Sequence, residues 1–181
     1  LERLVQRATA DAFDELLRAL LAERARIDQL GGADAATQAA WRLLEVDAES
    51  ADPEFAMRAI ATLDQGMETK LRRLMTAWLD GGKTDKSKGD TLDAWLTSDT
   101  DGRCAMTLPL FSAFFAGGGE STPFASAATK GVLKANSWFE EAHADCLDWI
   151  TNARERLWAA ECAADTEAAI RLASAIGEHY A

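Results

Sequence analysis

The stretch that decides the fold is residues 1–30, LERLVQRATADAFDELLRALLAERARIDQL, which opens the chain. Its apolar residues recur every three or four positions, the spacing that places side chains on one face of an α-helix. This stripe consists of Leu4, Ala8, Ala12, Phe13, Leu16, Leu17, Leu20, Leu21 and Ile27. Gly31 and Gly32 follow directly, and glycine is typical of a helix C-terminus. The stretch predicts one long amphipathic helix that ends near residue 30.

The composition of the whole chain extends this prediction. Among 181 residues there are 37 alanines but only three valines and five isoleucines. Alanine favours helix, whereas a sheet core needs the β-branched residues that are scarce here. We therefore expect an all-α fold in a single helical domain over residues 1–181. Its first helix is long, and so is its last helix, which follows Asn136 as its N-cap and runs almost to Tyr180.

Local signals place further boundaries between these two helices. The tripeptide Asp-Pro-Glu at 52–54 is a strong helix start, with a capping residue followed by proline and an acid in the first turn. Gly66 is expected to break or kink the helix that begins there. The polar segment 83–90 is expected to lie outside the helices and to lead into a short helix around residues 92–96.

Charge limits the classes of partner. The net charge is −11, divided as −5 over residues 1–80, zero over 81–134 and −6 over 135–181. An acidic chain argues against a general nucleic-acid coat, so a contact with a polyanion should fall in the middle third. No apolar run approaches the length of a membrane span, so we expect no membrane association. Three widely spaced cysteines do not form a disulfide framework, which favours a reducing cytoplasm.

Two short motifs could carry chemistry. Gly82-Lys83-Thr84 resembles part of a phosphate-binding loop, but Ala77 stands where that motif needs glycine, and a helix precedes it in place of a strand. His143 and Cys146 share a helix face and could touch a metal, although packing in the core explains a buried cysteine better. We expect no metal site, and the chain contains no catalytic motif; whether it belongs to an enzyme is left open by these residues.

Lysines are concentrated in the middle third. The cluster consists of Lys83, Lys86 and Lys88, with Lys130 and Lys134 further along. Trp78 and Trp95 flank the first group, and lysines beside aromatic rings can hold a phosphate backbone and stack bases. Tryptophans in an all-α domain are more often part of the core. The residues alone predict a helical module with a candidate polyanion contact in its middle.

Several segments, taken in order, resemble the AddA family of alphaproteobacterial helicase–nuclease subunits, which are UvrD/Rep-like superfamily 1 helicases that repair double-strand breaks. The central segments are GGKTDKSKGDTLDAWL at 81–96, LFSAFF at 110–115 and AATK at 127–130. The opening segments are LERL at 1–4, DAFDELL at 11–17 and LAER at 21–24, and the closing helix to Tyr180 is similar as well.

This resemblance implies that the chain is the helical 1B insertion within the first motor domain of a larger ATP-dependent helicase and exonuclease. The start at Leu1 fits a fragment, and the two ends of an insertion should lie close together. ATP and Mg²⁺ would be bound by the parent protein, with no cofactor in this fragment. The implied partners are forked DNA or duplex ends and the partner helicase–nuclease subunit, and the fragment itself is expected to be monomeric.

The resemblance also narrows the set of residues that we expect to contact DNA. Similar proteins tend to carry several basic residues before the Ala-Thr-Lys, whereas residues 117–129 here contain none. The DNA-contact candidates are Lys83, Lys86, Lys88, Lys130, Lys134 and, in addition, Arg103. The competing hypothesis is a helical protein–protein interaction module, chaperone-like or granule-coating, with no role on DNA.

Overall fold

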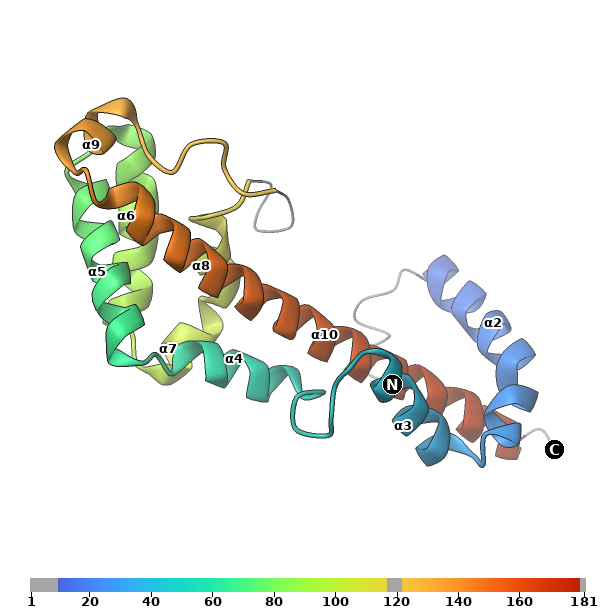
Figure 1. Ribbon diagram of the computed structural model, residues 1–181. Coiled ribbons are helices and arrows are strands. Elements are labelled where there is room, and N and C mark those ends of the chain that lie inside the picture. The colour runs from blue at the N-terminus through green and yellow to red at the C-terminus, as the bar shows by residue number, and fades with distance from the viewer. Residues whose placement is uncertain (1–9, 117–121, 180–181) are drawn as a thin grey trace. The chain divides into compact units, whose positions relative to one another are not determined.

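The computed structural model describes residues 10–116 and 122–179, and it confirms the predicted all-α fold (Figure 1). Within these ranges, β-type pairing is confined to an isolated antiparallel bridge between Phe115 and Pro123. The chain divides into two compact units: unit 1 comprises residues 1–55 and 156–181, and unit 2 comprises residues 56–155. That these units form a single domain stays a prediction. The two chain ends, whose closeness was predicted, lie outside the described residues.

Unit 1 contains α2 (Ala10–Gln29), α3 (Ala33–Leu43) and the C-terminal part of α10 (Phe139–His179). Gly31 and Gly32 follow α2 with φ angles of 97° and 95°, a region that favours glycine. The Gly32 N–H donates to the Ile27 carbonyl at 3.0 Å, which closes the end of the helix. The predicted glycine stop is therefore confirmed, while residues 1–9 of the predicted first helix lie outside the described residues.

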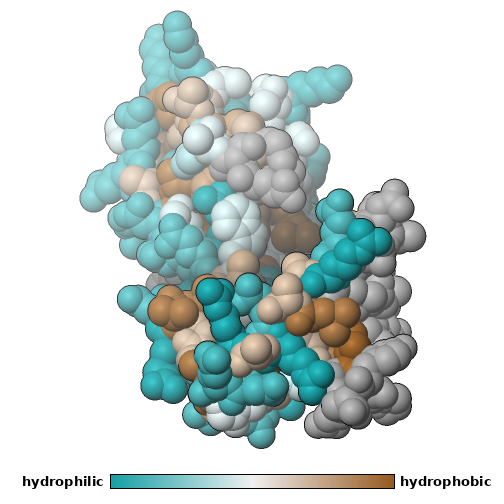
Figure 2. Space-filling model, turned by 90° about the vertical axis from the view of Figure 1, so that its right-hand side faces the viewer, coloured by the Kyte–Doolittle hydropathy of each residue, from teal (hydrophilic) through white to brown (hydrophobic). Residues whose placement is uncertain are grey.

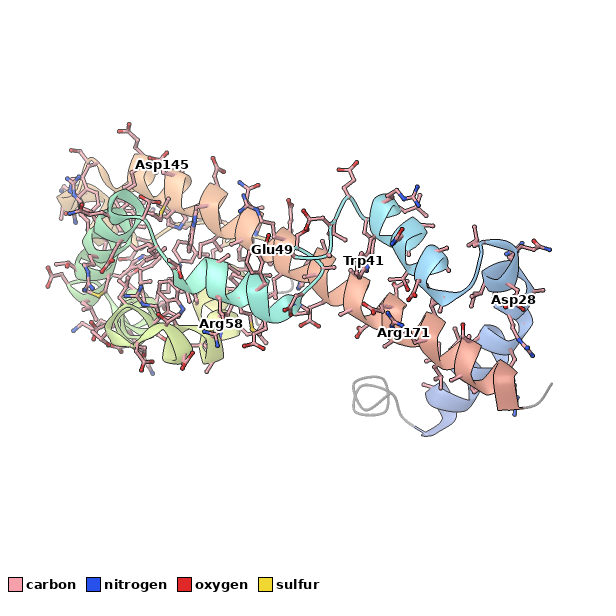
Figure 3. The ribbon with its side chains drawn as sticks, turned by 90° about the horizontal axis from the view of Figure 1, so that it is seen from below. Asp28, Trp41, Glu49, Arg58, Asp145 and Arg171 are labelled. Carbon is pink, nitrogen blue, oxygen red and sulfur yellow. The ribbon has the colours of Figure 1, made fainter. Side chains whose placement is uncertain are left out.

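The core of unit 1 is small. Ile27, Ala36 and Ala173 are buried together, and Leu20 and Ile170 pack against them. An ion pair joins α10 to α3: Arg171, which is labelled in Figure 3, places its Nη2 3.3 Å from Asp34 Oδ1. Two exposed side chains form this pair, so it contributes little stability.

Unit 2 holds the larger core. Its helices are α4 (Pro53–Ala61, shared with unit 1), α5 (Gln65–Leu79), α6 (Lys83–Thr97), α7 (Thr100–Ala105), α8 (Thr107–Ser112), α9 (Lys130–Ala135) and the first part of α10. Helices α5 and α6 pack along each other as a helical hairpin (Figure 1). Trp78 and Trp95 are both fully buried between the helices, as the core interpretation of the tryptophans predicts.

The start of α4 matches the sequence signal, and its end does not. The helix begins at Pro53, and the Glu54 N–H donates to Asp52 Oδ1 at 2.9 Å. It ends at Ala61, whereas a break was predicted at Gly66. Asp64 starts α5 by accepting a hydrogen bond from the Met67 N–H at 3.0 Å, so Gly66 lies inside the first turn of the new helix. A capping side chain, not the glycine, sets this boundary.

The polar segment 83–90 is helical, which corrects the prediction that it lies outside the helices. It forms the first half of α6, a single helix from Lys83 to Thr97. Within residues 10–116 and 122–179, no helix is both long enough and apolar enough to cross a membrane.

Candidate nucleic-acid interface

The start of α6 presents two of the candidate lysines. Lys83 is the first residue of the helix and Lys86 follows three positions later, so their side chains lie on one face. Both are exposed to solvent. They line an open concavity of about 540 Å³ together with Gly81, Gly82, Ser87 and Asp90. The lining therefore contains two positive ammonium groups, from Lys83 and Lys86, and one carboxylate, from Asp90.

A buried carboxylate joins this helix start to a distant segment. Asp85 is 1% exposed. Its Oδ2 accepts hydrogen bonds from the Gly82 N–H at 3.2 Å and from the Thr129 hydroxyl at 2.6 Å, and its Oδ1 accepts one from the Thr129 N–H at 3.0 Å. Thr129 occupies the N-cap position of α9, directly before its first residue. Asp85 therefore holds the first turn of α6 against the start of α9, across 44 positions of sequence.

The two segments approach so closely that a glycine is needed between them. A Cβ atom at Gly81 would lie 2.6 Å from the Asp85 side chain and 2.7 Å from Val132 Cγ2 of α9. Real Cβ atoms do not make contacts this short, so any larger residue would force α9 away from α6. Gly81 and Asp85 together fix the spacing of the two helices.

This arrangement brings four lysines to one end of unit 2. Lys130 and Lys134 are exposed on α9, one helical turn apart, next to the start of α6 that carries Lys83 and Lys86. Figure 1 shows α9 lying across the end of the hairpin formed by α5 and α6. We call Lys83, Lys86, Lys130 and Lys134 the lysine end.

Lys88, the fifth candidate lysine, has a structural role and is not retained as a DNA-contact candidate. It is 8% exposed, and its Nζ donates to the Ala127 carbonyl at 3.3 Å. The ammonium group lies 4.3 Å from the ring centroid of Phe124 and 5.5 Å from that of Trp78. Burial lowers the pKa of Lys88 below its usual 10.5. Because the Lys88 ammonium group is buried and already hydrogen-bonded within the protein, it is not available to bind a phosphate.

Arg103 also serves the fold. Its guanidinium donates to the Leu96 carbonyl at 2.9 Å and to the Ala61 carbonyl at 3.2 Å. The same group lies 5.1 Å from the ring centroid of Trp95. These contacts satisfy carbonyls near the ends of α6 and α4, so Arg103 acts as a capping residue inside unit 2 and is removed from the DNA-contact candidates.

The glycine-lysine-threonine motif does not fit a nucleotide. In a phosphate-binding loop the backbone N–H groups point at the phosphates. Here the Gly82 N–H is already bound by Asp85, and Lys83 begins a helix that follows another helix. The prediction that Gly82-Lys83-Thr84 is not such a loop agrees with this geometry.

His143 and Cys146 belong to the core. The His143 ring lies 5.9 Å from Trp78, 5.5 Å from Phe114 and 6.1 Å from Phe139 between ring centroids. Burial, with a smaller effect from the charge of Lys88, lowers the pKa of His143 to about 4. Burial raises the pKa of Cys146 to about 12. Among the residues that the structure describes, no group of three or more His, Cys, Asp or Glu side chains could hold a metal ion.

Sequence reasoning overlooked Asp85, the residue that assembles the lysine end. A signal was present, because Asp85, Gly89, Leu92 and Leu96 follow the spacing of one helix face. Reading 83–97 as a helix would have placed Asp85 and Lys88 on the same side as Leu92. Its partner Thr129 had no comparable signal, because that contact spans distant parts of the chain.

Comparisons with known proteins identified no protein similar to this chain. A scan of protein-family models, a search of curated proteins and a search of solved structures each found no match to this chain. The resemblance to the AddA family therefore stays a prediction from the quoted segments.

Proposed function

We propose that this chain is a helical accessory module of an ATP-dependent DNA helicase and exonuclease, and that its lysine end contacts the DNA backbone. The observation that carries the proposal is the gathering of Lys83, Lys86, Lys130 and Lys134 at one end of unit 2. These exposed lysines come from two distant segments, and the contact of the buried Asp85 with Thr129, 44 residues later, holds the segments together. The resemblance to AddA supports the choice of helicase as the parent enzyme.

The chemistry of the lysine end suits phosphates better than bases. An ammonium group acts as a point charge that neutralises a phosphate without distinguishing one base from another. Binding should therefore lack sequence preference. The chain as a whole has a net charge of −11, so contact with DNA is restricted to this end. In the proposed enzyme, the module forms a wall along the DNA path while the remainder of the parent protein binds ATP and Mg²⁺ and carries out the chemistry.

A binding titration tests the proposal. Fluorescence anisotropy of a labelled forked DNA, measured with the chain at about 20 mM salt, should show weak binding that falls steeply as salt rises. If all four lysines contact phosphates, the log–log salt slope should lie between about −3 and −4. Replacing the four lysines with glutamine should abolish the binding. A chain that binds no DNA under these conditions, or a fourfold variant that binds as well as the wild type, would contradict the proposal.

A pair of single variants provides the matched control. Lys86→Gln should weaken binding and reduce the magnitude of the salt slope by about 0.7 to 0.9. Lys70→Gln removes the same charge from α5, where Lys70 pairs with Asp145 at 2.6 Å (Figure 3). This control should bind like the wild type, because Lys70 lies outside the lysine end and already has a partner.

A helical interaction module without a DNA role remains the second candidate. Unit 1 exposes large apolar side chains, among them Leu43 at 87% and Leu30 at 55%. Figure 2 shows brown apolar patches separated by hydrophilic residues on the face in view. This candidate predicts association of the chain with itself in analytical ultracentrifugation and no affinity for DNA, which is the reverse of the first proposal.

A further inference from the structure

A stacked cation–aromatic pair lies close to the lysine end. Arg73 on α5 places its guanidinium carbon 3.7 Å from the ring centroid of Trp138, which directly precedes α10. At this distance the guanidinium lies against the face of the indole. The Trp138 ring is half-buried and rests against the fully buried Phe139, with 5.7 Å between the ring centroids. The core thus anchors the tryptophan, and the tryptophan holds the arginine.

Arg73 and the adjacent Arg72 differ in the partners of their guanidinium groups. The adjacent Arg72 forms an ion pair with Glu68 at 2.7 Å and also donates to the Leu96 carbonyl. Arg73 is exposed and, among the described residues, forms no ion pair within 4 Å. Its guanidinium therefore rests on an aromatic ring while the residue as a whole stays exposed to solvent.

The position of this pair matches the proposed path of a nucleic acid. Trp138 follows Lys134 by four residues, and Arg73 lies six residues before the end of α5, about 9 Å along the helix axis. Figure 1 shows α9 and the first turn of α10 at the same end of unit 2 as the connection between α5 and α6. A strand held by the lysine end would therefore have the Arg73–Trp138 pair beside it.

The chemistry of the pair selects an unpaired base. Guanidinium planes and indole rings stack on nucleobases, and only single-stranded segments expose base faces for stacking. Glu140 and Glu141, both exposed, follow Trp138 in the first turn of α10. Their charges disfavour a phosphate at this place and leave a neutral base unaffected. Phosphates are thus favoured at the lysine end, and a base is favoured at the pair.

We propose that the exposed face of the Arg73 guanidinium, supported by Trp138, stacks an unpaired DNA base next to the lysine end. This inference rests on the proposed function, because it requires the lysines to hold the strand. It adds that the strand at this end is single-stranded and that a planar side chain contributes to its binding in addition to charge.

The test compares two single strands of equal length and charge, an oligothymidylate and an abasic oligonucleotide, by fluorescence anisotropy with the full chain. The wild type should bind the oligothymidylate about fivefold or more tightly than the abasic strand. Arg73→Lys keeps the charge and removes the plane, so it should lose this preference while its abasic binding stays unchanged. Arg72→Lys is the matched control and should keep the preference.

The outcomes separate the two proposals. Equal wild-type affinity for both strands, or a preference that survives in Arg73→Lys, overturns the stacking inference and leaves the lysine contacts intact. Absence of binding to either single strand, with the forked DNA still bound, overturns the stacking inference alone, and absence of binding to the forked DNA as well overturns both proposals. Thermal unfolding of each variant, followed by circular dichroism, verifies that the exposed substitutions leave the fold unchanged. Trp138→Phe retains an aromatic ring under Arg73 and should keep part of the preference.

Discussion

Asp85 and Lys88 stand three residues apart on α6, and both are charged side chains that the fold withdraws from solvent. A buried charge is tolerated only where hydrogen bonds or nearby charges replace water. Asp85 meets this requirement with Thr129 and Gly82, and Lys88 meets it with the Ala127 carbonyl and the rings of Trp78 and Phe124. Each residue organises the segment that precedes α9. The exposed lysines around them are the ones that we propose to contact DNA.

His143 makes the stability of the fold depend on pH. Its pKa in the folded chain is lowered from 6.5 to about 4, so the unfolded chain takes up a proton first as pH falls. Its contribution is complete above pH 6.5 and is lost as pH falls toward 4, by about 3 kcal/mol in all. Between pH 6.5 and 5 we expect the free energy of unfolding, measured in urea, to fall with a slope approaching about 1.4 kcal/mol per pH unit.

The variant His143→Leu isolates this effect. Leucine fills the same aromatic surroundings without a titratable group, so the slope over pH 6.5 to 5 should become nearly flat. Carboxylates contribute mainly below this window, because their ordinary pKa values lie near 4. If the variant and the wild type lose stability in parallel over this window, His143 is not the group responsible.

Among the helices, α6 depends on the close fit of a glycine against α5. A Cβ atom at Gly89 would lie 2.9 Å from Leu79 side-chain atoms and 3.0 Å from the Leu79 backbone nitrogen. Gly89→Ala should therefore destabilise the chain by about 1 to 3 kcal/mol, although alanine is the better helix former. Urea denaturation followed by circular dichroism measures the change.

Gly131 on α9 provides the matched control for that substitution. A Cβ atom there meets nothing closer than Thr129 Oγ1 at 4.0 Å. Gly131→Ala should leave stability unchanged or raise it by up to about 1 kcal/mol, through the helix preference of alanine alone. Equal effects of the two substitutions would show that helix propensity, and not the contact with Leu79, governs Gly89.

The sequence was informative where a boundary depends on neighbouring residues. The stop at Gly31 and the start at Pro53 were predicted because the capping groups are adjacent in the chain. The helical character of residues 83–90 was missed because three lysines and polar residues masked the spacing of the buried face. The lysine end was predicted only as a list of residues, since the contact between Asp85 and Thr129 that gathers them joins distant segments.

The two units of the chain differ in how many of their apolar side chains are buried. Unit 2 contains fully buried Leu71, Leu74 and Leu92 in the α5–α6 hairpin, whereas α2 contributes only Ile27 to the buried core among its described side chains. Among the residues that the structure describes, Thr37 Oγ1, Trp41 Nε1 and Ser174 Oγ of unit 1 are buried without a hydrogen-bond partner, as is Arg103 Nε of unit 2. Unpaired buried polar atoms reduce stability. Unit 1 should therefore open more readily than unit 2.

Hydrogen exchange measured by mass spectrometry tests this difference. Peptides from α2 and α3 should exchange about tenfold or more faster than peptides from α5 and α6. Slow exchange throughout both units would contradict the expectation and would indicate that the chain unfolds as one cooperative body. The measurement repeated with bound DNA should add protection at α6 and α9 if the lysine end is the contact.

The burial of Lys88 has a use in chemical footprinting. An amine-reactive acylating reagent can reach the four lysines of the lysine end, whereas the Lys88 amine is shielded beneath Phe124 and bonded to the Ala127 carbonyl. Acylation of Lys88 therefore reports molecules that have lost their fold. If the lysine end contacts DNA, adding DNA should lower acylation of its four lysines. Lys88 should stay unmodified before and after DNA is added, which shows in the same digest that the molecules remained folded.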